Sequence, residues 1–239
     1  MTKKLCDKIK AILFDLDKTL LEIDLEKFVQ QYLMLLAQSV APLNIPPKKF
    51  ISKILEASKA VERNNGHITN EEVYAKNFFP LEGYSREEIE PYFDEFYKNR
   101  FQKLKQFSKQ KPEAREIIQT AFDRGYDVVI ATMPILPRTA IEQRLEWAGI
   151  ADFPYRLITT IENSCSTKSL THLIYYEQIV NRLGYTAENC LMVGDEGRDI
   201  IAGRLGMKTF LIANNSIKLG PEIPEPTFKG TLSDLKLLL

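Results

Sequence analysis

Short apolar runs alternate with helical segments through the second half of the chain, and this alternation constrains the fold most strongly. The apolar runs lie at residues 126–131, 155–160, 190–193 and 209–213. The segments expected to be helical are 113–124, 138–148, 168–183 and 199–205, and each is followed by glycine, which favours the left-handed end of a helix. Because the runs lack polar alternation, both faces of their sheet must be covered. We therefore predict an α/β fold with a parallel sheet.

A further apolar run, Ile9 to Phe14, is separated from the others by a long block with helical spacing. Asp24 can cap a helix in this block, and Ser85 with Glu88 has the spacing of a capping box. A gap of this length cannot be a plain loop in a compact domain. We expect an α/β core of residues 1–20 and 110–239, interrupted by an all-helical cap domain of residues 21–109.

An open parallel sheet binds ligands at the carboxyl ends of its strands. The residues just after each predicted strand are therefore the candidates for a site, and Lys168 is expected at the start of the helix after the third run of the second half. These candidates are Asp15, Asp17, Thr19, Thr132, Lys168, Gly194, Asp195 and Asp199. The sequence thus predicts that acids, hydroxyls and one amine meet at one edge of the sheet.

Such an acidic cluster indicates a metal site. Neighbouring carboxylates raise one another's pKa, so the cluster needs a cation. Oxygen ligands suit Mg²⁺, which keeps several waters and accepts phosphate as a co-ligand. A carboxylate beside a bound phosphate can attack phosphorus, and a second carboxylic acid can protonate the leaving oxygen. Thr132 and Lys168 would hold and neutralise the phosphoryl oxygens.

The candidates also form four motifs in a recognisable order. Asp15-Leu16-Asp17-Lys18-Thr19 matches Asp-x-Asp-x-Thr, Thr132 and Lys168 match the second and third motifs, and Gly194-Asp195 with Asp199 matches the fourth. On these residues the chain resembles the phosphatase branch of the haloacid dehalogenase-like superfamily. The resemblance implies a Rossmann-like parallel sheet core with helices on both faces and a helical cap inserted after the first motif.

The resemblance further implies a role for each acid. Asp15 is expected to be the nucleophile and a Mg²⁺ ligand, and Asp17 the general acid/base, with its backbone carbonyl on the metal. Asp195 is expected to be a metal ligand, and Asp199 either to lie at the metal site or to orient the lysine. Thr19 would order the nucleophile loop. Together these roles describe a phosphatase that acts through an aspartyl-phosphate intermediate on a small phosphorylated metabolite.

Two positions depart from the family pattern and leave the substrate open. Met133 stands where many relatives have asparagine, and Ser169 where many have proline. Lys18 lies between the acids and is interpreted as a tolerated loop residue. In the cap, an aromatic stripe is interpreted as cap core rather than as a binding surface; it consists of Tyr92, Phe93, Phe96 and Tyr97.

Other readings of the same residues stay open. Taken singly, Asp199 is also a plausible helix cap, Lys168 a solvated lysine and Thr132 a turn hydroxyl. A phosphomutase would use the same acids, and a non-catalytic relative would bind phospholigands without turnover. Hydrolysis of a carbon–halogen bond needs neither an acid at position 17 nor a metal cluster, so Asp17 argues against it.

Charge and hydropathy narrow the partners. Lys plus Arg and Asp plus Glu balance at 32 each, so the composition carries no basic footprint for nucleic acid. The cationic cluster from Lys98 to Lys111 is interpreted as a solvated face. No apolar stretch is long enough for a bilayer, and three dispersed cysteines (Cys6, Cys165 and Cys190) suit reduced thiols. We expect a cytoplasmic protein without membrane or nucleic-acid partners; the oligomeric state is left open.

Overall fold

The structure is a computed structural model that describes residues 8–213 and 219–239, so Cys6 lies outside the described residues. Its centre is a six-stranded sheet in the order β5-β4-β1-β6-β7-β8, and all neighbouring strands are parallel. The strands are β1 (Ala11–Phe14), β4 (Asp127–Ile130), β5 (Leu157–Ile158), β6 (Cys190–Gly194), β7 (Lys208–Ile212) and β8 (Phe228–Gly230). The predicted α/β parallel sheet is confirmed.

Helices cover both faces of this sheet, which explains the uninterrupted apolar strands. On one face, Tyr175 and Ile179 of α7 (Ile174–Leu183) pack with Leu13 and Met192. On the other, Ile12 and Phe14 belong to a larger cluster shared with the remaining core helices. These are α5 (Pro112–Asp123), α6 (Arg138–Trp147) and α9 (Leu232–Leu238), while α8 (Gly197–Ile200) follows β6 and continues as a 3₁₀ turn, Ile201–Leu205.

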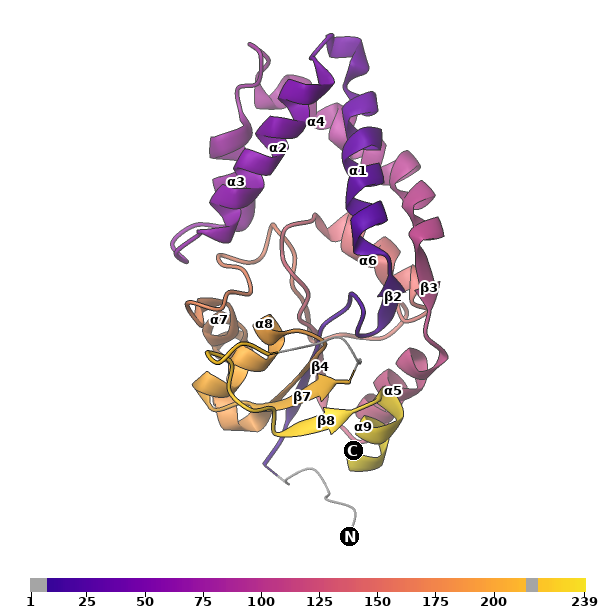
Figure 1. Ribbon diagram of the computed structural model, residues 1–239, viewed down its shortest axis with the longest axis vertical. Coiled ribbons are helices and arrows are strands. Elements are labelled where there is room, and N and C mark those ends of the chain that lie inside the picture. Colours follow the sequence, from indigo (N-terminus) through magenta and orange to yellow (C-terminus); the bar gives the residue numbers. More distant parts are fainter. Residues whose placement is uncertain (1–7, 214–218) are drawn as a thin grey trace.

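The inserted segment forms a helical cap that lies beyond the carboxyl ends of the strands (Figure 1). Its helices are α1 (Leu25–Ser39), α2 (Pro47–Glu62), α3 (Asn70–Phe78) and α4 (Arg86–Glu95), and α4 runs into a π-helical turn (Phe96–Arg100) and a 3₁₀ helix (Phe101–Phe107). Asp24 caps α1, and Ser85 with Glu88 forms the predicted capping box of α4. None of the helices in the described segments is both long and apolar enough to cross a bilayer.

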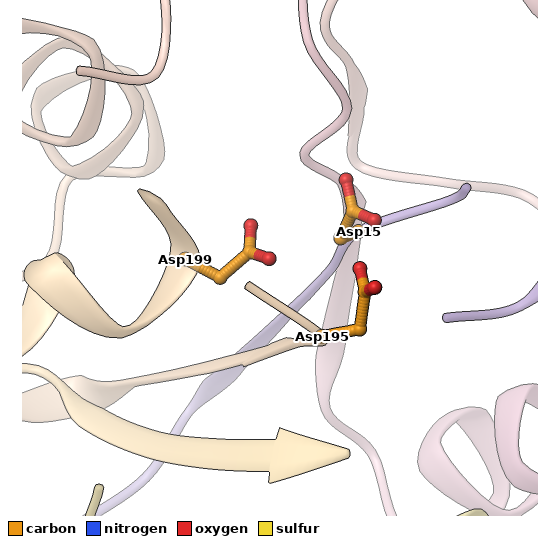
Figure 2. A group of neighbouring side chains, drawn as sticks. All are labelled: Asp15, Asp195 and Asp199. Carbon is orange, nitrogen blue, oxygen red and sulfur yellow. The ribbon is translucent and has the colours of Figure 1, made fainter. Parts of the chain in front are cut away.

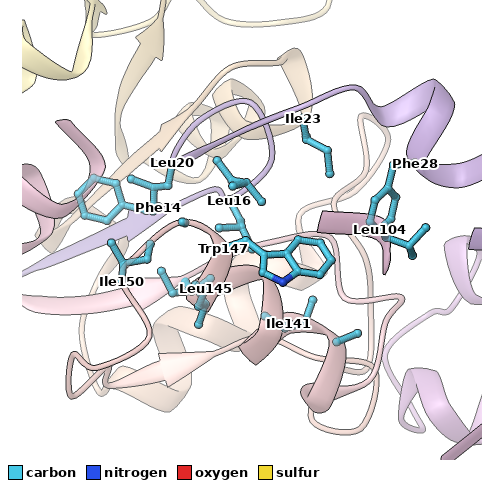
Figure 3. Packing of buried hydrophobic residues seen from close by; sticks show 14 of the residues in the cluster. Phe14, Leu16, Leu20, Ile23, Phe28, Leu104, Ile141, Leu145, Trp147 and Ile150 are labelled. Carbon is cyan, nitrogen blue, oxygen red and sulfur yellow. The ribbon is translucent and has the colours of Figure 1, made fainter. Parts of the chain in front are cut away.

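Cap and core share one apolar cluster. The ring of Trp147 in α6 stacks on Phe101 of the cap at 5.4 Å between centroids, and its neighbours run from Phe14 beside the sheet to Phe28 in α1 (Figure 3). This continuous packing holds the base of α1 and the end of the cap segment against α6.

Three local expectations were wrong. Residues 21–109 are not all helical, because β2 (Leu21–Ile23) and β3 (Ser108–Gln110) pair as an antiparallel ribbon where the chain enters and leaves the cap. Lys168 does not start a helix: it lies in a loop, and α7 begins at Ile174. The proline-rich tail holds the edge strand β8, paired with β7. The division of the chain into the two domains given above stays a prediction.

Candidate active site

Three carboxylates meet at the carboxyl ends of the two central strands. Asp15 follows β1 and Asp195 follows β6, and the backbone N–H of Asp15 donates to the Val193 carbonyl at 2.9 Å. Asp199 comes from the short helix α8. One oxygen of each carboxylate lies within 4.8 Å of the others, and all three side chains are buried (Figure 2). The strand ends therefore bring Asp15, Asp195 and Asp199 together as predicted.

Gly194 makes room for this arrangement. A side-chain carbon at position 194 would collide with the carboxyl group of Asp199, so only glycine allows Asp199 to turn back over the end of β6. The backbone N–H of Glu196 donates to Asp199 Oδ2 at 3.2 Å and orients the carboxylate. Asp199 therefore caps its own helix and also reaches the acidic cluster with its second oxygen.

Lys168 links two of the acids. Its ammonium group lies 2.6 Å from Asp15 Oδ1 and 2.6 Å from Asp199 Oδ1, and the residue is only 3% exposed. Burial opposes a charge on Lys168, but the two carboxylates outweigh it and raise the pKa of the lysine well above its ordinary value. A lysine from a loop thus supplies the cation that holds Asp15 and Asp199 in place.

The cluster nevertheless keeps an excess of negative charge. Burial, reinforced by the Asp15 charge, raises the pKa of Asp195 to about 7. Burial also raises the pKa of Asp15 and of Asp199, although Lys168 acts in the opposite direction. Three buried carboxyl groups that share one ammonium group fit a divalent cation, since hard oxygen donors are the ligands that Mg²⁺ prefers. Asp15, Asp195 and Asp199 are therefore the side chains suited to hold it.

Asp17 lies apart from this cluster. Its side chain is 22% exposed and forms an ion pair with Arg144 of α6, whose side chain is 3% exposed. Sequence reasoning missed Arg144, because an arginine in a helix usually faces solvent. A signal was present, since Arg144 follows the buried Ile141 and precedes the buried Trp147 by three residues and so shares their face.

The two hydroxyl candidates lie in the loops around the cluster. Thr132 is buried two residues beyond β4, and its carbonyl accepts hydrogen bonds from Thr159 Oγ1 at 3.0 Å and from the Tyr175 hydroxyl at 2.9 Å. Thr19 is also buried, and its hydroxyl has no partner within residues 8–213 and 219–239. The structure fixes the backbone of the Thr132 loop firmly at the carboxyl edge of the sheet.

Lys111 is a further residue that the sequence reasoning misplaced. Its ammonium group donates to the carbonyl of Lys18 and, at 3.1 Å, to that of Thr19. Burial lowers the pKa of Lys111, so this residue does not belong to a fully solvated face. Lys18 itself is exposed and has a φ of 61°, which places it in the left-handed region at the tip of the loop. Lys111 thus ties the loop that carries Asp17 to the base of the cap.

A cavity of about 400 Å³ opens between the cap and the core next to Asp17. Asp17, Met133 and Arg144 line it from the core, whereas α1, α3 and α4 contribute mostly aromatic and aliphatic side chains. Two members of the aromatic stripe, Phe93 and Tyr97, line this cavity, while Phe96 is fully buried. The interpretation of the stripe as cap core was therefore only partly right. Among the lining residues, Asp17 alone belongs to the predicted site.

One cap residue joins the loops on either side of the site. The side-chain nitrogen of Asn70 donates to the carbonyls of Pro134 and Ser166, each at 3.0 Å, and its backbone N–H donates to the Ser164 carbonyl at 2.7 Å. Pro134 lies two residues after Thr132, and Ser166 two residues before Lys168. Asn70 is fully buried, so it fixes the cap to both loops away from water.

Comparisons with known proteins agree with this geometry. A pyrimidine 5′-nucleotidase of Streptococcus pneumoniae is 29% identical over 195 residues, which cover 78% of this chain and 75% of that protein. A haloacid dehalogenase-type phosphatase of Thermococcus onnurineus has a TM-score of 0.57 at 19% identity, with 95% of this chain and 96% of that chain covered. L-2-haloacid dehalogenase of Xanthobacter autotrophicus has a TM-score of 0.59 at 14% identity, with 96% and 98% covered.

The two solved structures differ in chemistry, so they establish the fold alone. The family assignment comes from the sequence: the family model described as haloacid dehalogenase-like hydrolase matches residues 9–206. This range begins before β1 and ends after Asp199, and it therefore contains every predicted site residue. The predictions of an enzyme and of this superfamily are confirmed, and the chain belongs to the haloacid dehalogenase-like hydrolases.

Proposed function

We propose that the protein is a Mg²⁺-dependent phosphatase that hydrolyses the phosphate monoester of a small metabolite through an aspartyl-phosphate intermediate. The observation that carries the proposal is the division of labour between the two acids of the first motif. Asp15 lies in the acidic cluster beside Lys168, whereas Asp17 lies outside it, at the wall of the cavity. Two carboxyl groups in different surroundings can take different parts in one reaction.

In this proposal an oxygen of Asp15 attacks phosphorus, and the bond between phosphorus and the leaving oxygen breaks. Asp17 gives its proton to that oxygen, which departs into the cavity as an alcohol. Asp17 then takes a proton from a water molecule that attacks the aspartyl-phosphate, and inorganic phosphate leaves with Asp15 restored. Lys168 and Thr132 would stabilise the phosphoryl oxygens.

The metal would be held by the carboxylates of Asp15, Asp195 and Asp199 and by the backbone carbonyl of Asp17. When bound, it would neutralise the charge that builds up on the phosphoryl group during transfer. This ligand set rests on the family pattern and on the convergence of the three buried acids.

The test is phosphate release from an aryl phosphate, with and without Mg²⁺. We expect activity to require Mg²⁺, to vanish in Asp15→Asn, and to persist in Asp152→Asn, which removes an exposed carboxylate paired with Arg115 on the surface. Full turnover by Asp15→Asn would refute the nucleophile assignment. A phosphomutase would instead return phosphate to a second hydroxyl of the substrate, and a non-catalytic relative would bind phosphate without releasing it from an ester.

The substrate class is the finer part of the proposal. The relative described as a pyrimidine 5′-nucleotidase supports nucleoside 5′-monophosphates as the first phosphometabolites to assay. A cavity of about 400 Å³ lies in the range of small-molecule sites, so it is large enough for a leaving group beyond a simple sugar. Phosphate detection over a panel of phosphometabolites tests this choice. The cytoplasmic location stays a prediction.

A further inference from the structure

The cavity beside Asp17 carries unused recognition groups. Its wall can be followed by direct contacts from the site outward: Arg144, paired with Asp17, lies 5.7 Å from the ring centre of Phe28, and Phe28 stacks on Tyr32 at 6.4 Å. The hydroxyl groups of Tyr32 and Tyr97 lie 2.8 Å apart. A leaving group attached to a phosphate near Asp17 would therefore run along aromatic faces towards this pair of phenols.

The phenol pair always has one hydrogen left over. Each phenol can donate one hydrogen bond, and only one of the two can donate to the other. Whichever phenol donates within the pair, the hydrogen of its partner is available to a ligand. Tyr97 also lies in the π-helical turn after α4, a deviation from regular helix that is frequent at functional sites.

A spare acceptor lies in the same cavity. Glu162 Oε1 accepts from the backbone N–H of Arg138 at 2.9 Å, whereas Oε2 is buried and has no hydrogen-bond partner within residues 8–213 and 219–239. Glu162 is close enough to Tyr97 that its charge, after burial and Tyr32, contributes to raising the pKa of that phenol. A buried polar atom without a partner is costly, so a ligand that donates to Oε2 would be favoured.

The remaining lining defines what else the ligand can be. Val29 and Leu55 line the cavity and are 46% and 45% exposed, which leaves apolar surface for a ligand to cover. Both arginines of the lining are engaged by carboxylates: Arg144 by Asp17, and Arg86 by Glu71 at 2.7 Å and Glu90 at 2.5 Å. The cavity therefore suits a flat, uncharged leaving group rather than an anionic one.

From these groups we infer that the cavity recognises a leaving group that ends in a flat ring with a lactam edge, an N–H beside a C=O. Glu162 Oε2 accepts from the ring N–H, and the spare phenol hydrogen of the Tyr32–Tyr97 pair is donated to the ring carbonyl. The inference rests on the proposed phosphatase function, and it assigns specificity to residues outside the family motifs.

The kinetic test compares uridine 5′-monophosphate, its 3-methyluridine analogue, which lacks the ring N–H, and ribose 5-phosphate, which lacks the ring. We expect the wild-type protein to prefer uridine 5′-monophosphate over either by about tenfold or more in kcat/KM, the effect of one buried hydrogen bond. In Glu162→Gln the preference over the methylated analogue should fall to within about threefold, because an amide nitrogen replaces the acceptor.

Glu142→Gln is the matched control, because Glu142 lies on α6, pairs with the side chain of Arg138 and is not part of the lining. It should keep the wild-type preference. Equal loss on all three substrates in Glu162→Gln, or an unchanged preference, would overturn the inference, because Glu162 would then not read the ring N–H.

A binding measurement separates this inference from the proposed function. Calorimetry with uridine, which has no phosphate, should show binding to the wild-type protein that weakens about tenfold in Glu162→Gln and in the double variant Tyr32→Phe/Tyr97→Phe, but not in Tyr92→Phe. If aryl phosphate is hydrolysed but uridine does not bind, the inference fails and the phosphatase stands. If uridine binds as expected but no ester is hydrolysed, the proposed function fails and the recognition site stands.

Discussion

Lys168 Nζ lies 2.6 Å from Asp15 Oδ1, although the two residues are 153 positions apart in the chain. The same nitrogen lies 2.6 Å from Asp199 Oδ1, so one buried ammonium group joins the loop after β1 to the helix after β6. Neither carboxylate has this cation without the loop that carries Lys168. The contact therefore couples the fold of the core to the arrangement of its acids.

Replacing Lys168 with methionine should impair both activity and stability. The variant leaves two buried carboxylates without their cation, and loss of one partner of a buried ion pair costs about 3–5 kcal/mol. Phosphate release should fall about 10²-fold or more, since the lysine would also lose its contact with the phosphoryl group. Urea unfolding and turnover of an aryl phosphate measure the two effects. Lys236→Met, which breaks an exposed pair with Glu116, should cost about 1 kcal/mol or less.

The acidic cluster should make the stability of the metal-free protein depend on pH. Burial raises the pKa of Asp195 from 3.8 to about 7, so between these values the folded state holds a proton that the unfolded state has lost. The free energy of unfolding should then decrease as the pH rises from about 4 to about 7, by up to about 1.4 kcal/mol per pH unit for this proton. Asp195→Asn should remove this component.

Addition of Mg²⁺ provides the matching observation. A bound cation favours the ionised carboxylates, so it should stabilise the wild-type protein most at pH 8 and much less at pH 5. Asp195→Asn should lose most of this stabilisation, while it should be more stable than wild type at pH 8 without metal. A wild-type unfolding curve that does not respond to Mg²⁺ at pH 8 would contradict the ligand assignment.

The position of the acids could be predicted because strand ends determine it. Asp15 and Asp195 follow two apolar runs, and adjacent parallel strands place their ends side by side wherever the rest of the chain goes. Asp199 was predictable for a related reason, since it lies only four residues after Asp195 in the first turn beyond β6. Local sequence is sufficient where a short connection to a buried strand leaves no alternative.

Residues whose place depends on contacts between distant segments could not be predicted in the same way. The loop that carries Lys168 is held by Asn70 from the cap, and helical spacing alone made it look like the start of α7. Arg144 was missed because its partner, Asp17, is remote in sequence and a charged helix residue is normally solvated. The ribbon of β2 and β3 was missed because each strand has only three residues.

Arg144→Met should affect the reaction through Asp17. The ion pair orients the Asp17 carboxyl group at the cavity wall, and without it the proposed acid is free to take other rotamers. We expect kcat to fall about 10- to 100-fold with an alkyl phosphate, and clearly less with a p-nitrophenyl ester, whose leaving group hardly needs a proton. Arg138→Met on the same helix, which breaks an exposed pair with Glu142, should leave both rates near wild type. Equal losses on both esters would argue against an effect through Asp17.

Asn70→Ala should loosen the site from the side of the cap. It removes hydrogen bonds to the Pro134 and Ser166 carbonyls and leaves both buried without a donor, at a cost of about 1–3 kcal/mol each. Hydrogen exchange should increase at residues 164–168, and kcat should fall more than KM rises, because Thr132 and Lys168 lie next to the released carbonyls. Asn77→Ala is the control, since Asn77 bonds only within α3, to the Val73 carbonyl. Unchanged exchange at residues 164–168 would show that Asn70 does not hold this loop.

The charge of the cavity predicts which phosphate esters are poor substrates. Glu71, Glu90 and Glu162 line it, and its two arginines are already paired, so a carboxylate on the leaving group would meet like charge without a free cation. Glycerol 3-phosphate and 3-phosphoglycerate are a matched pair, because they differ mainly by that carboxylate. We expect the carboxylated ester to have a kcat/KM about tenfold lower or less, with the difference shrinking at high salt. If 3-phosphoglycerate were the better substrate, an arginine of the cavity would have to leave its carboxylate partner to bind it, and Arg86→Gln would then abolish the preference.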